Sequence, residues 1–241
     1  MKNLLLSGLS RGLGLELARQ LLARGYQIFG ISRSKTEALA ALQALHPQRL
    51  HWQACDLAQP ALLKEQVFGS LIPKDLPIHG LINNAAIAYD DLLTNVKMEP
   101  LEQMFAVNVY SPMMLCREVI RNMLLHRQGG SLVHLSSVCA HTGYKGLSMY
   151  AASKGALEAF SRTLAREWGP KEIRSNCVVA GFMETEMSAG LSEEQKAKIY
   201  RRNALQGPAE LASVASTVIY LLEEGAASIT GQEIIVDSGS L

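Results

Sequence analysis

The fold of this chain is decided near its amino terminus by the stretch NLLLSGLSRGLG, residues Asn3–Gly14. A short apolar run, typical of a buried β-strand, leads directly into a glycine-rich turn and then into a helical pattern. Gly8, Gly12 and Gly14 would let the backbone approach a pyrophosphate, which the N–H groups and the positive end of the helix stabilise. Because the turn lies between a first strand and a helix, it predicts a dinucleotide site.

Strand-like and helix-like segments alternate along the rest of the chain. The expected strands are Asn3–Ser7, Tyr26–Ser32, Leu50–Cys55, Ile78–Asn83, Ser131–Ser136, Ile173–Val179 and Glu233–Val236. The expected helices are Leu13–Arg24, Lys35–Leu45, Ala61–Leu71, Leu101–His126, Met149–Trp168 and Pro208–Glu223. This alternation predicts an α/β fold with a mostly parallel seven-stranded sheet and helices on both faces. Since the chain shows no Pro/Gly-rich linker, repeat or low-complexity stretch, we expect one domain over residues 1–241.

Composition narrows the function classes. The 241 residues are 48% hydrophobic and 19% charged, which is ordinary for a globular protein with a large core. The formal net charge of +1 gives no electrostatic case for a nucleic-acid partner. No apolar run is long enough to span a bilayer, and the apolar amino-terminal run is too short for a signal peptide. Four scattered cysteines favour reduced thiols and a cytoplasmic setting, and no His or Cys spacing indicates a metal site.

The end of the second expected strand bears on the choice of cofactor. Proteins that bind NAD usually carry an acidic residue here for the ribose hydroxyls, whereas this chain has Ser32 and Arg33. The nearest acid, Glu37, is better explained by a capping box with Ser34 at the start of the next helix. Arg33, helped by Arg11, is able to pair with a 2′-phosphate. A solvated loop arginine is the alternative, and the missing acid favours NADP(H).

Tyr150 and Lys154 form a pair within the expected helix Met149–Trp168. Residues four apart lie on the same helix face, so a phenol and an ammonium group are expected to be neighbours. A nearby positive charge favours the phenolate and is expected to lower the pKa of Tyr150 from its usual value of about 10. Taken alone, such a pair is better explained by an ordinary amphipathic helix.

Read together, these residues resemble the short-chain dehydrogenase/reductase family, and the resemblance covers essentially the whole chain. Besides the glycine-rich turn and the tyrosine pair, the matching elements are Asn83-Asn84-Ala85-Ala86, Asn108, Ser137, Asp56 and Ala180-Gly181-Phe182-Met183-Glu184-Thr185. Ser7, Ala86 and Ala180 depart from the family pattern, in which Thr, Gly and Pro are usual. The resemblance implies a Rossmann-type doubly wound fold and a nicotinamide dinucleotide, for which we expect NADPH.

The resemblance also implies the roles of individual residues. Ser137 would hydrogen-bond the substrate oxygen, Tyr150 would exchange a proton with it, and Lys154 would hold the nicotinamide ribose. The predicted catalytic residues are Asn108, Ser137, Tyr150 and Lys154. The predicted cofactor-binding residues are Gly8, Ser10, Arg11, Gly12, Leu13, Gly14, Arg33, Asp56, Leu57, Asn84, Ala85, Tyr150, Lys154, Gly181, Met183 and Thr185. Ser136 competes with Ser137 but is expected to point to the opposite face of the strand.

Asn108 supports an independent prediction. In a regular helix its carbonyl would accept a hydrogen bond from residue 112, which is Pro112 and has no N–H. The sequence therefore predicts a kink and a free carbonyl at Asn108. In the family, the backbone of this asparagine holds a water of the proton path; a plain proline kink is the alternative.

The substrate is less constrained. The nearest resemblance is to the β-ketoacyl-[acyl-carrier-protein] reductases, which implies a carrier-bound β-ketoacyl thioester. Lys171 and Arg127 lie at or near positions that dock the acidic carrier, whereas Tyr89 departs from the pattern. The candidate residues for an apolar substrate pocket are Phe182, Met183, Met187, His141 and Tyr144. One alternative is that the substrate is a sugar, steroid or xenobiotic ketone; another is that the protein is a non-catalytic cofactor sensor. We also expect a substrate lid at 187–203 and a homotetramer.

Overall fold

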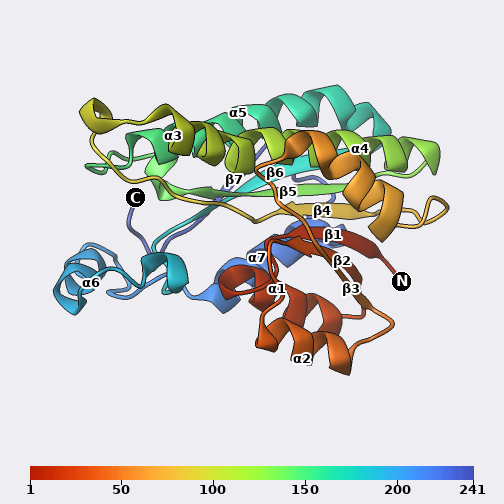
Figure 1. Ribbon diagram of the computed structural model, residues 1–241, viewed down its shortest axis with the longest axis horizontal. Coiled ribbons are helices and arrows are strands. Elements are labelled where there is room, and N and C mark those ends of the chain that lie inside the picture. Colours follow the sequence, from red (N-terminus) through yellow and green to blue (C-terminus); the bar gives the residue numbers. More distant parts are fainter.

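In the computed structural model, which describes residues 1–241 apart from the side chain of Met187, seven strands form one sheet between two helix layers (Figure 1). The strands are β1 (Asn3–Ser7), β2 (Gln27–Ser32), β3 (Leu50–Ala54), β4 (Gly80–Asn83), β5 (Gly130–Ser137), β6 (Ile173–Ala180) and β7 (Glu233–Val236). Their order is β3-β2-β1-β4-β5-β6-β7, and every neighbouring pair is parallel. The predicted α/β, doubly wound, seven-stranded fold is confirmed, with strand ends within two residues of expectation.

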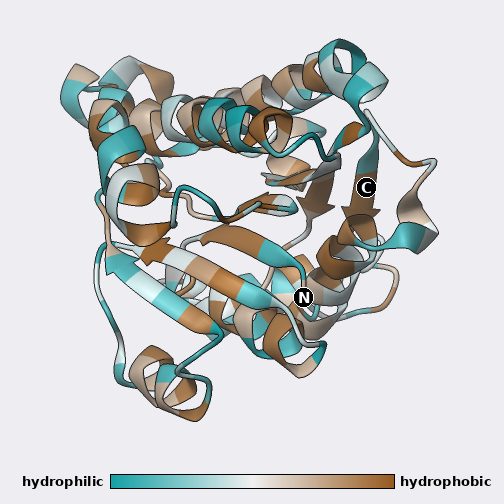
Figure 2. Cartoon of the chain, turned by 90° about the vertical axis from the view of Figure 1, so that its right-hand side faces the viewer, coloured by the Kyte–Doolittle hydropathy of each residue, from teal (hydrophilic) through white to brown (hydrophobic). Residues whose placement is uncertain are grey.

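The helices bury one apolar face each against the sheet. On one side lie α1 (Gly12–Ala23), α2 (Glu37–Leu45) and α7 (Leu211–Leu222), whose leucines and valines share a core with β1, β2, β5 and β6. On the other side lie α4 (Ser111–Leu125) and α5 (Ser148–Trp168), which pack on the opposite faces of the same strands. Figure 2 shows the hydrophobic residues concentrated on the inner strands and the sheet-facing sides of the helices. Strands buried on both faces explain the nearly continuous apolar runs in the sequence.

The end of α1 and the start of α2 show which of the predicted helix-boundary signals are used. Gly25 (φ +83°) ends α1 in the left-handed region, and the N–H groups of Gly25 and Tyr26 reach back to the carbonyls of Leu22 and Leu21. The predicted capping box of Ser34 with Glu37 is wrong. Helix α2 begins at Glu37, and its cap is Thr36, whose Oγ1 accepts from Leu39 N. Thr36 Oγ1 also donates to the Ser10 carbonyl across 2.6 Å, so the cap ties α2 to the glycine-rich turn.

The expected helix Leu101–His126 is divided in the structure. It consists of α3 (Met98–Phe105), a π-helical segment Ala106–Tyr110 and α4. At the junction, Ser111 N donates to the Ala106 carbonyl five residues back, and Pro112 occupies the first turn of α4. A change of hydrogen-bond spacing is expected where proline lacks an N–H, so the predicted irregularity at Asn108 is present. That the Asn108 carbonyl is free stays a prediction.

Two other segments complete the description. In place of the expected helix Ala61–Leu71, the chain forms a short 3₁₀ turn (Pro60–Leu62) and a π-type helix (Lys64–Leu71). The expected lid at 187–203 contains a 3₁₀ turn that ends at Ser188 and helix α6 (Glu193–Tyr200). No helix in the described part of the chain is both long and apolar enough to cross a membrane.

The strand order places the site. β1 lies between β2 and β4, so the strand order reverses at β1: the chain passes from β1 to β2 and β3 on one side and continues with β4 on the other. Open α/β sheets bind ligands in the crevice at such a switch point. The glycine-rich turn follows β1 and Asn84 follows β4, which is the arrangement the sequence predicts.

Candidate active site

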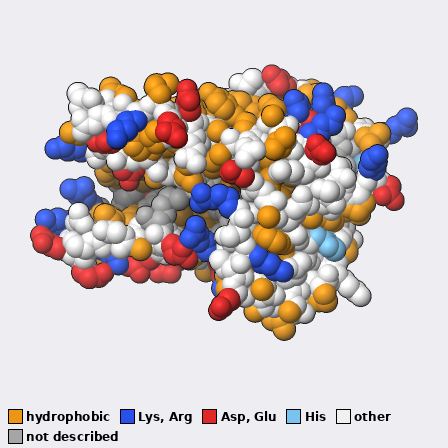
Figure 3. Space-filling view, viewed as in Figure 1, with side chains coloured by type: hydrophobic (Ala, Val, Ile, Leu, Met, Phe, Trp, Pro, Cys, Tyr) orange, Lys and Arg blue, Asp and Glu red, His pale blue; other side chains and the backbone are white. Residues whose placement is uncertain are grey.

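A cleft of about 770 Å³ opens at the carboxyl ends of the strands. On the same face, Figure 3 shows the molecule hollowed between the region of α6 and the helices above it, with Lys and Arg side chains beside the hollow. The predicted site residues that line the cleft are Gly8, Ser10, Arg11, Gly12, Leu13, Gly14, Arg33, Asp56, Leu57, Asn84, Ala85, Tyr150, Lys154, Met183 and Thr185. Asn108, Ser137 and Gly181 are not among the lining residues. The structure thus gathers into one cleft predicted site residues that are up to 177 positions apart (8–185) in the chain.

The glycine-rich turn is held in place by close backbone contacts. Gly8 has φ +74°, and a Cβ atom there would lie 2.7 Å from Ala85 Cα. A Cβ atom on Gly14 would lie 2.0 Å from the Gly8 carbonyl oxygen, so only glycine allows α1 to start this close to the turn. Asn84 Nδ2 donates to the carbonyls of Ser7 and Gly8, both at 3.0 Å. The role of Asn84 visible here is to fix the turn.

The hydroxyl group of Ser7 joins β1 to the segment after β4. It lies 3.1 Å from Asn84 N and 3.2 Å from Ala85 N, and accepts from both. Ser7, which stands where Thr is usual in the family pattern, therefore keeps the hydroxyl acceptor of this junction.

The predicted phosphate-binding arginines differ in their surroundings. Arg33 is exposed at the end of β2 and lines the cleft between Ser32 and Ser34. Ser32 Oγ accepts from Trp52 Nε1 and donates to the Ser34 carbonyl, so the loop that carries Arg33 is fixed. Arg11 instead forms an ion pair with Glu186 across the mouth of the cleft. Of the two, Arg33 is the one placed to meet a phosphate without first breaking an ion pair.

Tyr150 and Lys154 lie one turn apart on α5, as predicted. Lys154 is 3% exposed, its Nζ donates to the Leu135 carbonyl at 2.7 Å, and it lies 5.6 Å from the centroid of the Tyr150 ring. The net lowering of the Tyr150 pKa that the sequence predicts is not found in this structure. Burial raises the pKa of Tyr150, with the charges of Cys139 and Asp90 adding to the rise and Ser137 opposing it. Burial likewise lowers the pKa of Lys154 to about 8.

The two serines at the end of β5 point to different partners. Ser136 is buried, and its Oγ donates to Glu158 Oε1 on α5. Ser137 is half-buried, its Oγ accepts from Cys139 N at 3.2 Å, and it is close enough to Tyr150 to act on the tyrosine pKa. Alternation along the strand therefore leaves Ser137, not Ser136, on the side of the tyrosine hydroxyl.

Asn108 acts in this structure through its side chain. The residue is fully buried; Ile87 N donates to its Oδ1 at 2.9 Å, and its Nδ2 donates to the Ile87 carbonyl at 2.9 Å and to Ser153 Oγ at 3.0 Å. Ser153 Oγ donates in turn to the Tyr150 carbonyl at 2.7 Å. Asn108 thereby ties the segment after β4 to the helix turn that carries the tyrosine.

The segment after β6 closes the other side of the cleft. Gly181 packs against the chain after β7, since a Cβ atom there would lie 2.5 Å from Asp237 Cα. Thr185 caps the following 3₁₀ turn, and a Cβ atom on Gly12 would lie 3.5 Å from its Cγ2. Phe182 packs against Tyr200 of α6, with ring centroids 6.0 Å apart. Met183 lines the cleft, whereas the side chain of Met187 lies outside the described residues.

Three acidic groups near the site were not predicted. Asp90, in the loop after β4, is close enough to Tyr150 to act on its pKa. Glu158 and Glu233 converge on His141, within one group of metal-type ligands among the described residues. Their carboxylates already meet Ser136 and Arg162, so the group is a hydrogen-bonded ion cluster. Positions 141, 158 and 233 have no spacing that a sequence motif could reveal.

Comparison with known proteins assigns the family. Residues 8–240 match the family described as enoyl-(acyl carrier protein) reductase. The chain is 35% identical to the human 3-oxoacyl-[acyl-carrier-protein] reductase over 96% of this chain and 94% of that protein. It is 34% identical to carbonyl reductase family member 4 of Danio rerio (96% and 94%) and 31% identical to L-xylulose reductase of Caenorhabditis elegans (99% and 95%). The chain belongs to the short-chain dehydrogenase/reductase family.

Solved structures agree with this short-chain dehydrogenase/reductase fold. A 4-hydroxyisoleucine dehydrogenase complexed with NADH has a TM-score of 0.93 and 23% identity, covering 100% of this chain and 98% of that chain. A protein assigned as a 2-deoxy-D-gluconate 3-dehydrogenase from Agrobacterium tumefaciens, with bound NADP, has a TM-score of 0.91 and 21% identity (99% and 96%). These likenesses show the fold, and the family membership makes this short-chain dehydrogenase/reductase an oxidoreductase.

Proposed function

We propose that this protein is an NADPH-dependent ketoreductase that reduces a β-ketoacyl thioester, carried on an acyl carrier protein, to the β-hydroxyacyl thioester. The observation that carries the proposal is the single cleft that joins the glycine-rich turn to Tyr150 and Lys154. A dinucleotide bound along such a cleft would lie with one end at Arg33 and the other at the reacting pair.

The residues present fit a nicotinamide dinucleotide. Gly8 and Gly14 allow the turn and the start of α1 to pack closely. The first turn of α1, Gly12–Gly14, therefore lines the cleft, where the positive end of a helix favours a phosphate group. Arg33 lies where NAD-binding proteins usually have an acid, so a 2′-phosphate would meet a cation and not a carboxylate. This charge arrangement supports NADPH over NADH.

The chain's own groups account for the proton part of the reaction. When bound, the cofactor supplies a hydride to the carbonyl carbon. Because burial raises the pKa of Tyr150, its phenol stays protonated at neutral pH and is able to give its proton to the carbonyl oxygen. Ser137 Oγ, beside the tyrosine, would donate a hydrogen bond to the same oxygen. Lys154 places a buried positive charge near the ring and stabilises the tyrosinate left after proton transfer.

The proposed substrate is supported by the relatives. Enzymes named 3-oxoacyl-[acyl-carrier-protein] reductases from human, mouse, rat and cow match at 34–35% identity over 94% of their length. Lys171 is exposed after α5, and we propose it as part of the docking surface for the acidic carrier. A cytoplasmic homotetramer belongs to the same proposal.

Reduction of another small carbonyl compound is the second candidate. It is supported by the relatives named carbonyl reductase and L-xylulose reductase, whose identity and coverage are similar. A non-catalytic sensor is disfavoured because Ser137, Tyr150 and Lys154 are all retained.

A substrate panel tests the proposal. The purified protein is mixed with NADPH or NADH and with acetoacetyl thioesters of coenzyme A and of an acyl carrier protein, longer β-ketoacyl thioesters, L-xylulose and aromatic ketones. NADPH oxidation with a β-ketoacyl thioester, faster on the carrier than on coenzyme A, is the expected result. Turnover confined to the sugar or the aromatic ketones would establish the second candidate.

A further inference from the structure

Glu158 is a buried carboxylate that the proposed chemistry has not used. It lies on α5 and is 6% exposed. Tyr150, Lys154 and Glu158 are spaced four residues apart, so they follow one another along one face of the helix. Carboxylates are almost never this deeply buried unless paired, so its partners indicate what it does.

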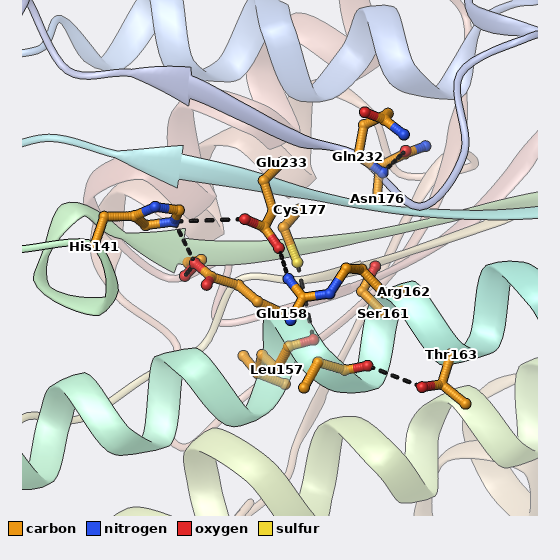
Figure 4. Close-up of polar contacts among 12 residues, drawn as sticks. His141, Leu157, Glu158, Ser161, Arg162, Thr163, Asn176, Cys177, Gln232 and Glu233 are labelled. Carbon is orange, nitrogen blue, oxygen red and sulfur yellow. Dashed lines mark hydrogen bonds and ion pairs between the residues drawn. The ribbon is translucent and has the colours of Figure 1, made fainter. Parts of the chain in front are cut away.

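Its partners stand on both sides of Ser137. Ser136 Oγ, one residue before, donates to Glu158 Oε1, and His141 Nε2, four residues after, lies 3.0 Å from the same oxygen. Figure 4 shows His141 and Glu158 pointing toward each other from the loop after β5 and from α5. Because both flanks of the loop are attached to one carboxylate, the position of Ser137 relative to α5 depends on Glu158.

Lys154 makes the matching contact one helical turn earlier. Its Nζ donates to the carbonyl of Leu135, the strand residue that precedes Ser136. Two successive turns of α5 therefore hold two successive residues of β5, one through a cation and one through an anion. Both side chains are buried, and charges act more strongly on one another there than in water.

The second carboxylate of the cluster, Glu233, differs from Glu158 in its partners and in its exposure. Glu233 on β7 is ion-paired with Arg162, and its Oε2 lies 3.7 Å from His141 Nε2 (Figure 4). Its side chain is 21% exposed, whereas that of Glu158 is 7% exposed. Glu233 therefore offers a control of the same residue type in the same cluster, facing its own cation.

We propose that Glu158 is a positioning residue for the reaction: it anchors both flanks of Ser137 to α5 and sets a buried negative charge one helical turn from Lys154. The inference rests on the proposed function for its consequence in turnover. The effect of the Glu158 charge on the Lys154 pKa does not depend on the proposed function, because it is a property of the protein without cofactor or substrate.

The charged and titratable groups around Lys154 determine how its pKa should respond when the charge of Glu158 is removed. Around Lys154 lie Tyr150 on α5, Cys139 after β5, His134 on β5 and Cys177 on β6, together with Glu158. Burial lowers the pKa of Lys154, and Cys177, Cys139 and Glu158 oppose that change. Within the pH range of activity the thiols stay neutral, since burial raises the pKa of both. Glu158 is then the group whose fixed charge keeps the ammonium form populated, and His141 and Arg162 are the cations on its outer side.

The test compares Glu158→Gln with Glu233→Gln. Glutamine keeps an oxygen that accepts from Ser136 but removes the charge. Protein labelled with ¹³C at the lysine ε-carbon reports the Lys154 titration by NMR without cofactor or substrate, and Lys154→Arg assigns the signal. We expect the Lys154 pKa to fall by about one pH unit in Glu158→Gln and to stay in place in Glu233→Gln. An unchanged titration in Glu158→Gln, or an equal shift in both variants, would overturn the proposal.

A second variant separates anchoring from charge and keeps the test valid if Glu158→Gln is unstable. Glu158→Asp retains the carboxylate but withdraws it by one methylene from Ser136 and His141. We expect kcat to fall by about tenfold with little change in the Lys154 titration, while thermal unfolding confirms a folded protein. Unchanged kcat in a folded Glu158→Asp would reject the anchoring of Ser137.

The two proposals fail in different ways. If no carbonyl compound is reduced, the proposed function fails, yet the lysine titration still decides the electrostatic role of Glu158. If the protein reduces a carbonyl but neither Glu158 variant changes titration or kcat, the positioning role alone is wrong.

Discussion

Lys154 donates a hydrogen bond to the carbonyl oxygen of Leu135, with 2.7 Å between Nζ and O, and so holds a buried cation against the end of β5. The contact fixes the ammonium group beside the Tyr150 ring, but burial also lowers the pKa of the lysine to about 8. The charge of Lys154 is thus present at neutral pH and is lost under mildly alkaline conditions.

The pH dependence of the free enzyme should report this lysine. Because Lys154 loses its proton as the pH rises through about 8, kcat/KM should be highest below that value and decline above it. Measuring kcat/KM from pH 6 to pH 10 tests this, with Lys74→Gln, an exposed lysine, as the control. A profile that stays flat to pH 10 would mean that the free enzyme does not need the lysine cation.

Removing the tyrosine hydroxyl should separate binding from chemistry. Tyr150→Phe keeps the ring beside Lys154 but has no proton to give, so kcat should fall by about 10²- to 10⁴-fold while NADPH binding persists. Single-turnover NADPH oxidation and fluorescence titration measure the two effects. Tyr110→Phe, at an exposed tyrosine of the π-helical segment, should leave both unchanged. Retained turnover in Tyr150→Phe would assign the proton to another group.

Reversing the charge at the end of β2 should change cofactor preference. Arg33→Asp should weaken NADPH binding by about 10- to 100-fold and affect NADH little, because only NADPH carries the 2′-phosphate. Lys35→Asp is the matched control, since Lys35 lies over the Trp52 ring, 5.6 Å from its centroid. Dissociation constants for both cofactors check this, and equal losses for NADPH and NADH would refute the phosphate contact.

Because Gly14 lies so close to the Gly8 carbonyl, adding one methyl group at Gly14 should lower the stability of the protein. In Gly14→Ala the new Cβ would lie 2.0 Å from the Gly8 carbonyl, so we expect a loss of about 1–3 kcal/mol or more. Gly155→Ala, within α5 and with nothing within 4 Å of the new atom, should be neutral or stabilise by up to about 1 kcal/mol. Urea unfolding of the two variants measures the contrast, which equal stabilities would contradict.

The buried His134 should make the protein acid-sensitive. The residue is fully buried between Asn83 and Ser175, and burial lowers its pKa to about 4. The unfolded chain therefore binds a proton that the folded protein resists, and stability is lost as the pH falls through 6.5 toward 4. Between pH 7 and pH 5 this group alone should cost about 2 kcal/mol. His134→Gln should lose correspondingly less stability over that interval in urea unfolding; an identical acid dependence would rule this origin out.

Part of the site could be predicted from the sequence because its residues lie close together in the chain. The glycine-rich turn needs three glycines within seven positions, and Tyr150 and Lys154 need only one helical turn. Ser137 was distinguished from Ser136 by family spacing and by strand alternation, and in the structure the two hydroxyl groups have different partners. Their functional roles stay predictions until the variants are measured.

Other features depend on distances that the sequence does not contain. Whether Thr36 or Ser34 caps α2 was decided by a contact with Ser10, on a different loop. The direction of the Tyr150 pKa was misjudged because spacing reveals a neighbouring charge but not the degree of burial, and burial is the larger influence here. Arg11 was expected to help with a phosphate, yet the fold brings Glu186 to it from far along the chain.

The sequence by itself determined the class of fold, the place of the cleft and the position of Tyr150 and Lys154 one helical turn apart, because strand and helix periodicity, the glycine-rich turn and the tyrosine–lysine spacing are all short-range patterns. Only the tertiary structure decided how those groups are charged and held. Burial, which raises one pKa and lowers the other, and the convergence of Ser136, His141 and Glu233 on one face of α5 arise from packing between segments up to 97 positions apart (136–233).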